Sequence, residues 1–261
     1  MKKLLTLVLV LGIAFGASFS VHADEFAAWA KDLPDNHWAK WDIKFFKGVG
    51  YLDGVLLRDD EPTIDPEKPI TRAEFVSLIN LIVSNNFLNE KEKADFEDFD
   101  QNDILDSFSD VDSSHWAKKH ISWAVENGTI GGYLNGKGAD KQGRAILSPD
   151  ANITRQEAMT IMSKVIMQKK AWSRADENAK AKIKEGRHAD LIDSKARGNL
   201  AFNDTDKIAK WALPFVEDCF AKGIVKGNEA NNIEPTKNIT RAEALKMLKN
   251  VTEKEGYKVG K

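Results

Sequence analysis

The chain has 261 residues, 30% of them charged, and its 40 acidic residues slightly exceed its 38 lysines and arginines. A formal net charge of −2 favours neither nucleic acid nor an anionic membrane surface as a partner. The single cysteine excludes an internal disulfide, so packing must hold the fold together.

The first residues resemble a secretory signal peptide. Lys2 and Lys3 precede a nearly unbroken apolar stretch from Leu4 to Phe15, and small residues follow near Ala23. We therefore predict a signal peptide over residues 1–23, cleavage after Ala23 and export of the mature chain. The apolar stretch is short for a membrane span and no later stretch is long enough, so no span is expected in the mature chain.

A five-residue phrase, Ile-Thr-Arg-Ala/Gln-Glu, occurs three times, at residues 70–74, 153–157 and 239–243. Its threonine and glutamate have the spacing of a capping box, which predicts a helix beginning at each threonine. The arginines that follow, Arg72, Arg155 and Arg241, then lie at the positive end of a helix dipole, which is unfavourable by roughly 0.3–1 kcal/mol. These arginines therefore need another explanation.

The phrase belongs to a longer repeat. A tryptophan followed by apolar residues at helical spacing predicts a helix upstream of each phrase, at Trp38, Trp116 and Trp211. Twelve residues later a five-residue turn is bounded by two glycines, and the first glycine is expected to end the helix. The pairs are Gly50 and Gly54, Gly128 and Gly132, and Gly223 and Gly227. An aspartate precedes each tryptophan: Asp32, Asp110 and Asp204.

The combined pattern of Phe-x-Asp, Trp-Ala, paired glycines and Ile-Thr-Arg-x-Glu resembles the S-layer homology domain family in three tandem copies. The first copy departs from it, because Ala30 stands where the others have Phe108 and Phe202. The resemblance implies a mostly α fold, with three helical repeats packed as a pseudo-threefold assembly. It also implies a secreted protein at the cell wall or cell surface, whose grooves between repeats bind an anionic, often pyruvylated, secondary cell-wall polysaccharide.

The repeats divide the mature chain into five parts: repeat 1 (24–90), an acidic linker (91–105), repeat 2 (106–168), a charged helical insertion (169–198) and repeat 3 (199–261). The linker resembles the start of a calcium-binding loop, but Asp103 replaces the required glycine, so a solvated linker is favoured. The insertion is interpreted as solvated helix, with a surface for a partner protein as the alternative. Cys219 is expected to fill a core position.

The recurring residues are the candidate glycan-binding residues. Each arginine either pairs with a carboxylate of the glycan or joins two helices through Asp32, Asp110 or Asp204. The tryptophans are more readily explained as core than as sugar-stacking platforms. Gly54, Gly132 and Gly227 either let a sugar approach the backbone or only shape the turn.

The function predicted is non-covalent anchoring to the wall without catalysis. A catalytic site would be unique, whereas the notable residues here occur three times. No catalytic residues, metal ligands or cofactors are expected. A protein-interaction scaffold at the cell surface and, less readily, a wall-glycan hydrolase with two carboxylates are the alternatives.

Overall fold

The computed structural model describes residues 30–59, 63–87, 106, 108–132, 145–193, 195 and 199–256. The predicted signal peptide and the predicted acidic linker, with its calcium-loop resemblance, lie outside these residues.

Each predicted repeat contributes a short helix followed by a long one. The pairs are α2 (Lys40–Gly48) and α3 (Arg72–Phe87), α6 (Lys118–Glu126) and α7 (Arg155–Ser173), and α9 (Leu213–Ala221) and α10 (Arg241–Lys254). Helix α8 (Glu177–Lys184) and the 3₁₀ helices η1 (His188–Leu191) and η2 (Thr205–Lys207) lie between α7 and α9. Extended segments in the described part of the chain pair only through isolated bridges, so the predicted mostly α fold is confirmed. No helix of this part is long and apolar enough to cross a membrane.

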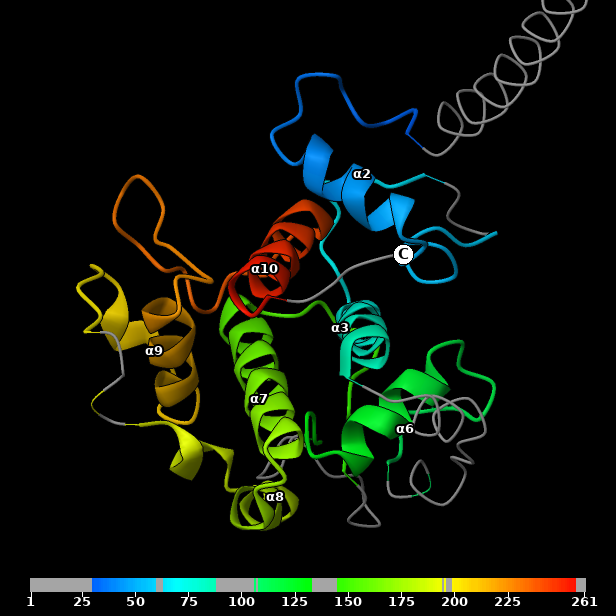
Figure 1. Ribbon diagram of the computed structural model, residues 1–261. Coiled ribbons are helices and arrows are strands. Elements are labelled where there is room, and N and C mark those ends of the chain that lie inside the picture. The colour runs from blue at the N-terminus through cyan, green and yellow to red at the C-terminus, as the bar shows by residue number, and fades with distance from the viewer. Residues whose placement is uncertain are drawn as a thin grey trace, which may run out of the picture.

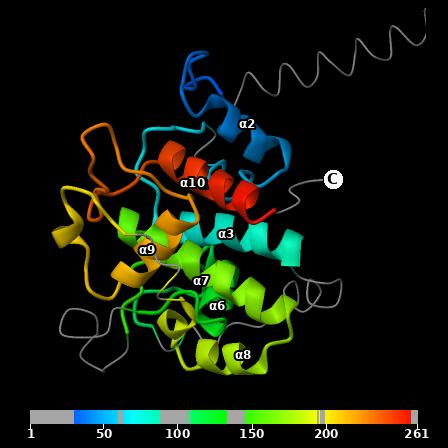
Figure 2. The ribbon, with the colours of Figure 1, turned by 60° about the vertical axis from the view of Figure 1, so that its left-hand side comes forward.

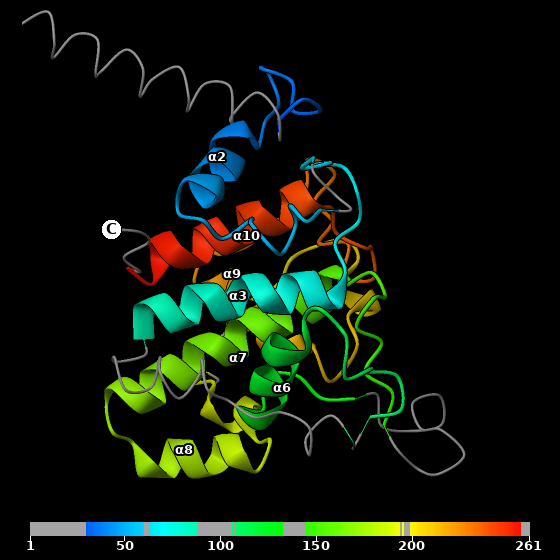
Figure 3. The same ribbon diagram turned by 90° about the vertical axis from the view of Figure 1, so that its right-hand side faces the viewer.

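The three long helices form the centre of the molecule, and the short helices lie outside them (Figure 1). Each short helix packs on the long helix of another repeat: α6 on α3, α9 on α7, and α2 on α10. Figures 2 and 3 show the long helices lying side by side and running in the same direction. The long helix of each repeat is therefore covered by the short helix of another repeat.

A ring of backbone hydrogen bonds joins the starts of the long helices. The amide of Ile70 donates to the carbonyl of Ile239 at 3.0 Å, that of Ile239 to Ile153 at 3.2 Å, and that of Ile153 back to Ile70 at 3.0 Å. Three segments from different repeats are thus fixed against one another without a sheet. The ring agrees with the predicted pseudo-threefold assembly, which as a statement about the whole molecule stays a prediction.

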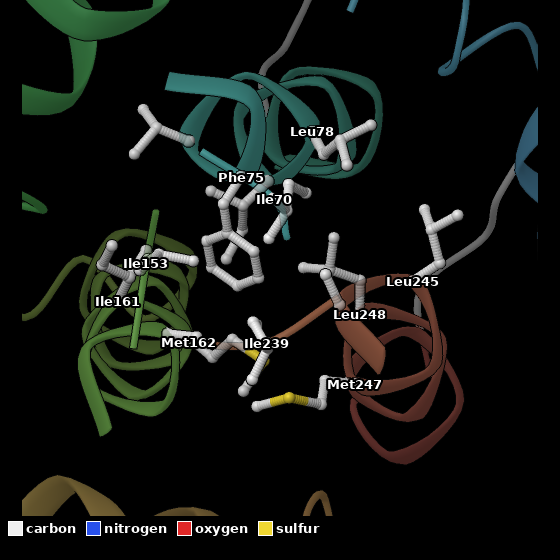
Figure 4. Close-up of a cluster of buried hydrophobic side chains, with 14 of the residues drawn as sticks. Ile70, Phe75, Leu78, Ile153, Ile161, Met162, Ile239, Leu245, Met247 and Leu248 are labelled. Atoms are coloured by element: carbon white, nitrogen blue, oxygen red, sulfur yellow. The ribbon is translucent and has the colours of Figure 1, made fainter. Parts of the chain in front are cut away.

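One apolar core serves all three repeats. Phe75 of α3, Met162 of α7 and Leu248 of α10 are fully buried, and Figure 4 shows the Phe75 ring between the three helices. Burial of a side chain of this size stabilises the fold by roughly 1.5–3 kcal/mol. The three repeats therefore share one core, and we expect them to fold together.

The segment after Met167 is less solvated than its composition predicts. Helix α7 continues to Ser173, and α8 lies beside it (Figure 3). Ala171, Ala179 and Ile183 of this segment form one small buried cluster, and Ile192 forms a second with Met167 and with Phe215 of α9. Part of the predicted insertion therefore belongs to the packed structure.

Cys219 is fully buried in α9, which confirms the predicted core position. Burial raises the pKa of its thiol, and the nearby Asp218 carboxylate raises it further. The thiol is therefore protonated and unreactive at neutral pH.

Candidate functional site

The predicted capping boxes form at the starts of the long helices. At α3 the Thr71 hydroxyl accepts the amide of Glu74 at 3.2 Å, and the Glu74 carboxylate accepts the amide of Thr71 at 2.9 Å. The same reciprocal pair caps α10, and at α7 the glutamate half of the box forms. The threonine hydroxyl thus caps α3 and α10 as the sequence predicts, whereas at α7 the Thr154 hydroxyl makes no hydrogen bond.

The next amides of each helix start are occupied by another repeat. The amide of Arg72 donates to the carbonyl of Ala151 at 2.9 Å, and that of Ala73 to Pro149 at 2.8 Å. The equivalent bonds join Arg155 to Lys237, Gln156 to Pro235, Arg241 to Lys68, and Ala242 to Pro66. Backbone carbonyls therefore occupy these amides, which leaves them no donor for an anion.

The arginine side chains cross into the next repeat. Arg72 donates to the carbonyl of Leu147 at 3.1 Å and lies 3.6 Å from the Glu157 carboxylate. Arg241 donates to the carbonyl of Ile64 at 3.1 Å and to Glu74 at 2.6 Å. Each guanidinium thus meets a capping-box glutamate of another helix, which offsets the unfavourable position at its own helix start.

Arg155 makes the weakest version of this contact. It donates to the carbonyl of Lys226 at 3.1 Å, and the Glu243 and Glu234 carboxylates favour its charge. Burial has the larger effect and lowers its pKa. Lys237 pairs with the same two glutamates, at 3.0 Å and 3.6 Å, and so shares the carboxylates that face Arg155.

The aspartates bind loop backbone rather than arginines. Asp110 accepts the amides of Leu147 and Ser148 at 2.8 Å and 2.7 Å. Asp204 accepts those of Ile233 and Glu234, and Asp32 accepts that of Asp65. The predicted arginine–aspartate staple is therefore wrong. Each aspartate instead stabilises a residue at positive φ just before a proline: Asp65 at 46°, Ser148 at 55° and Glu234 at 53°.

The tryptophans are not core residues. Trp38, Trp116 and Trp211 are 57%, 38% and 53% exposed. Each short helix begins two residues after its tryptophan, not at it, so the indole precedes the buried helix face. The favoured core interpretation is wrong, and the exposed rings leave sugar stacking open.

The closing glycines have two different explanations. Gly54 has φ +72° and nothing within 4 Å of a Cβ added to it. A Cβ on Gly132 would lie 3.1 Å from the Phe108 ring and 2.5 Å from the Ala145 Cβ, and one on Gly227 would lie 2.5 Å from the Phe202 ring. At the last two positions glycine is required by internal packing rather than by a sugar.

A pocket of about 330 Å³ lies where the three repeats meet. Three of the predicted site residues line it, each from a different repeat: Arg72, Gly132 and Trp211. The structure also brings in the α7 residues Glu157, Thr160, Ile161 and Lys164 and the turn residues Thr129, Ile130 and Gly131. We refer to it as the Arg72 pocket.

Lys164 adds a second cation to the described lining of this pocket. Its pKa is lowered, first by burial and then by the Arg72 guanidinium. Its ammonium lies 3.5 Å from the carbonyl of Gly128. Among the described residues that line the pocket, two are cations, Arg72 and Lys164, and one is a carboxylate, Glu157. Such a site favours an acidic ligand group.

The other two arginines have different partners. Glu74 holds the fully buried Arg241 and also Arg58, at 3.4 Å, and Arg58 stacks on Trp116 at 4.7 Å from the ring centre. We call these four residues the Arg241 cluster. Arg155, Glu243 and Lys237 form the Arg155 cluster, in which a lysine already faces the glutamate. The three positions are therefore unequal, as the sequence differences between repeats suggest.

Sequence reasoning missed Lys164 because it does not recur. The equivalent positions, nine residues after each arginine, are Leu81 and Asn250. A signal nevertheless existed: Glu157, Thr160 and Lys164 follow one another at helical spacing and so share a face of α7.

Two segments of the chain, 107–159 and 201–245, match the family model of the S-layer homology domain. These two segments are similar to S-layer homology domains. The matched segments fall in the second and third predicted repeats, and the first repeat makes the same helix-start contacts as these two.

Similar proteins include surface anchors and large enzymes. The chain is 33% identical to a cellulosome-anchoring protein of Acetivibrio thermocellus over 51% of its length and 25% of that protein. It is 28% identical to an amylopullulanase of Thermoanaerobacterium thermosulfurigenes over 94% of its length and 11% of the enzyme. It is 25% identical to a surface-layer 125 kDa protein of Lysinibacillus sphaericus over 72% of its length and 12% of that protein. The chain thus spans a quarter or less of these relatives.

Proposed function

We propose that this protein binds a cell-wall polysaccharide non-covalently and is held at the bacterial cell surface by it. The two segments that match the S-layer homology domain model support this function, as do relatives named as surface-layer and cellulosome-anchoring proteins. The observation that carries the proposal is the Arg72 pocket, in which two cations and an exposed tryptophan from three repeats face one space.

The pocket suits a sugar that carries a carboxylate. Arg72 and Lys164 provide charged donors for the acidic group, and the exposed indole of Trp211 provides a flat apolar surface for a sugar ring. A pyruvate ketal on a wall polysaccharide has this combination of groups. We therefore assign primary ligand contact to Arg72, Lys164 and Trp211, with Gly132 in the pocket wall.

The other predicted residues take secondary roles in this proposal. In the Arg241 cluster Arg58 already covers a face of Trp116, and Arg241 is fully buried. In the Arg155 cluster Lys237 competes for the glutamates. The three aspartates act through the loops that they hold. One strong site and two weaker ones follow from this arrangement.

We also propose that the chain is not an enzyme. Hydrolysis of a glycosidic bond needs two carboxyl groups on either side of the bond, roughly 5–10 Å apart. Among the described residues that line the Arg72 pocket, Glu157 is the one carboxylate, and it is engaged by Arg72 and by the amide of Thr154. Relatives named as glycosidases are several times longer than the matched region.

Co-sedimentation with cell-wall sacculi from the producing bacterium tests the proposal. The mature protein should pellet with native sacculi and stay in the supernatant with sacculi stripped of their secondary polymer by acid. Equal binding to stripped sacculi would contradict a polysaccharide ligand. The same incubation should release no reducing ends, and their release would contradict the absence of catalysis.

A further inference from the structure

The three glycines that end the short helices differ in their surroundings. Gly50, Gly128 and Gly223 all have positive φ, 76°, 66° and 66°, as a helix-ending glycine should. A Cβ added to Gly50 would have nothing within 4 Å, and one added to Gly223 would meet only the flexible end of Lys254. One added to Gly128 would lie 3.3 Å from His188 Cε1 and 3.4 Å from the carbonyl oxygen of Ile183. Among these three turns, the one at Gly128 is supported by a further element, the segment that carries α8 and η1.

His188 is an unusual residue for such a support. Its side chain is fully buried, and neither ring nitrogen makes a hydrogen bond of normal geometry. Burial and the charge of Lys164 lower its pKa to about 4, while the nearby Gly186 carbonyl acts in the opposite direction. At neutral pH the ring is therefore uncharged and acts through its shape. Buried polar atoms without partners cost roughly 1–3 kcal/mol each, which the surrounding packing must offset.

The supported turn is the wall of the Arg72 pocket. Thr129, Ile130, Gly131 and Gly132 line that pocket, and Lys164 donates to the carbonyl of Gly128 at 3.5 Å. Gly128 thus lies close to the His188 ring, and its carbonyl accepts from the Lys164 ammonium. A displacement of the turn would move both the pocket wall and the acceptor of the lysine.

The segment that carries His188 is itself anchored. Ala179 and Ile183 of α8 pack on Ala171 of α7, and Ile192 packs with Met167 of α7 and Phe215 of α9. Asp176 caps α8 by accepting the amide of Ala179 at 2.9 Å. The support is therefore attached to the same long helix that carries Glu157 and Lys164.

We propose that residues 174–193 are an accessory element of the Arg72 pocket and that His188 is a positioning residue in it. Its ring holds the 128–132 turn in place, and through the Gly128 carbonyl it fixes Lys164 for the acidic group of the ligand. The consequence for binding rests on the proposed glycan function. The effect on the turn does not depend on any ligand.

Amide hydrogen exchange of the unliganded protein tests the effect on the turn. In His188→Ala, exchange at residues 128–132 should be at least tenfold faster, while the equivalent turns at 50–54 and 223–227 keep their rates. His188→Phe retains a ring of similar size and should leave all three turns near the wild-type rates. Val251→Ala, in the buried face of α10, serves as a control for a general loss of stability and should not accelerate exchange at the 128–132 turn selectively.

Unchanged exchange at 128–132 in folded His188→Ala would overturn the proposal. If His188→Ala does not fold, exchange at 128–132 is compared between His188→Phe and His188→Leu. A support that depends on the ring predicts faster exchange in the leucine variant, and equal rates would overturn the proposal.

Binding to native sacculi then tests the consequence for the ligand. His188→Ala should bind at least fivefold more weakly than wild type, and His188→Phe should bind like wild type. Suppose that His188→Ala shows faster exchange but binds normally, while Arg72→Ala loses binding. This result would overturn the positioning role of His188 alone. A wild-type protein that does not bind sacculi would overturn the proposed function, while the exchange result would still decide whether His188 supports the turn.

Discussion

The Arg241 guanidinium donates to the Glu74 carboxylate at 2.6 Å, across 167 positions of sequence. The pair joins the start of α10 in the third repeat to the start of α3 in the first. Both side chains are almost fully buried, at 0% and 2% exposure. The contact connects the last repeat to the first, beside the ring of hydrogen bonds between Ile70, Ile153 and Ile239.

Replacing Arg241 should destabilise the fold more than replacing Arg155. Arg241→Ala leaves the buried Glu74 charge with the amide of Thr71 and, among the described cations, the longer Arg58 contact, and breaking a buried pair in this way costs about 3–5 kcal/mol. Arg155→Ala should cost about 1 kcal/mol, because its hydrogen bond goes to a carbonyl and Lys237 remains beside the glutamates. Unfolding in urea without ligand measures both free energies.

The control for this prediction removes the stranded charge. Glu74→Gln keeps most of the shape of the side chain and abolishes its charge, so Arg241→Ala combined with Glu74→Gln should be more stable than Arg241→Ala alone. Equal free energies of unfolding for the Arg241→Ala and Arg155→Ala variants would contradict the different roles assigned to the two arginines.

Replacing Lys164 in the Arg72 pocket should weaken ligand binding without destabilising the fold. Lys164→Met keeps an unbranched apolar chain and removes a charge that burial disfavours, so the free energy of unfolding should stay constant or rise slightly. Affinity for native sacculi should fall by about 1.5–3 kcal/mol, the usual contribution of a hydrogen bond to a charged group, or roughly tenfold to a hundredfold. Lys246→Met, on the exposed face of α10, is the matched control and should weaken binding less. A stable Lys164→Met variant that binds normally would remove Lys164 from the site.

Features set by local chemistry were predictable from the sequence. The threonine caps, the positive φ of Gly128 and its equivalents, and the burial of Cys219 follow from the residue and its neighbours along the chain. The exposure of Trp38 was not predictable in this way. It depends on the helix beginning two residues later, which places Ala39, Ile43 and Phe46 on the buried face.

Features set by contacts between repeats could not be predicted from one repeat. The sequence around Arg72 does not show which carboxylate the side chain meets. Its partner, Glu157, is supplied by the long helix of the next repeat. Lys164 and His188 were missed because a search for recurring residues passes over positions that occur once. His188 lies in a stretch whose charged composition conceals the apolar residues that pack it.

The phenylalanine of each Phe-x-Asp motif should explain the closing glycine of the same repeat. Gly227→Ala places a Cβ about 2.5 Å from the Phe202 ring and should destabilise the protein by about 1–3 kcal/mol. In a Phe202→Ala background the same change should cost much less, because the ring is gone. Chemical unfolding of the two single variants and the double variant gives the coupling energy. The first repeat already has this combination in part, with Ala30 in place of phenylalanine and open space at Gly54. Additive effects of the two substitutions would show that Phe202 does not determine the need for glycine.

The buried His188 should make stability depend on pH between about 4 and 6.5. Its folded pKa of about 4 lies below the ordinary value of 6.5, so within this range the unfolded chain binds a proton that the folded protein does not. The free energy of unfolding therefore rises with pH across this range, by about 1.4 kcal/mol per pH unit. Below the folded pKa the whole contribution of His188, on the order of 3 kcal/mol, is lost. The Lys164 charge, which faces the ring, opposes its protonation. Urea unfolding from pH 3.5 to 7.5 should be compared between wild type and His188→Phe, which has no group to protonate there. The carboxylates that titrate at lower pH are common to both proteins, so their effects cancel in the difference. That difference should be constant above pH 7 and should turn against the wild type as the pH falls towards 4. Parallel curves over the whole range would mean that the ring is protonated as easily in the folded protein as in the unfolded chain.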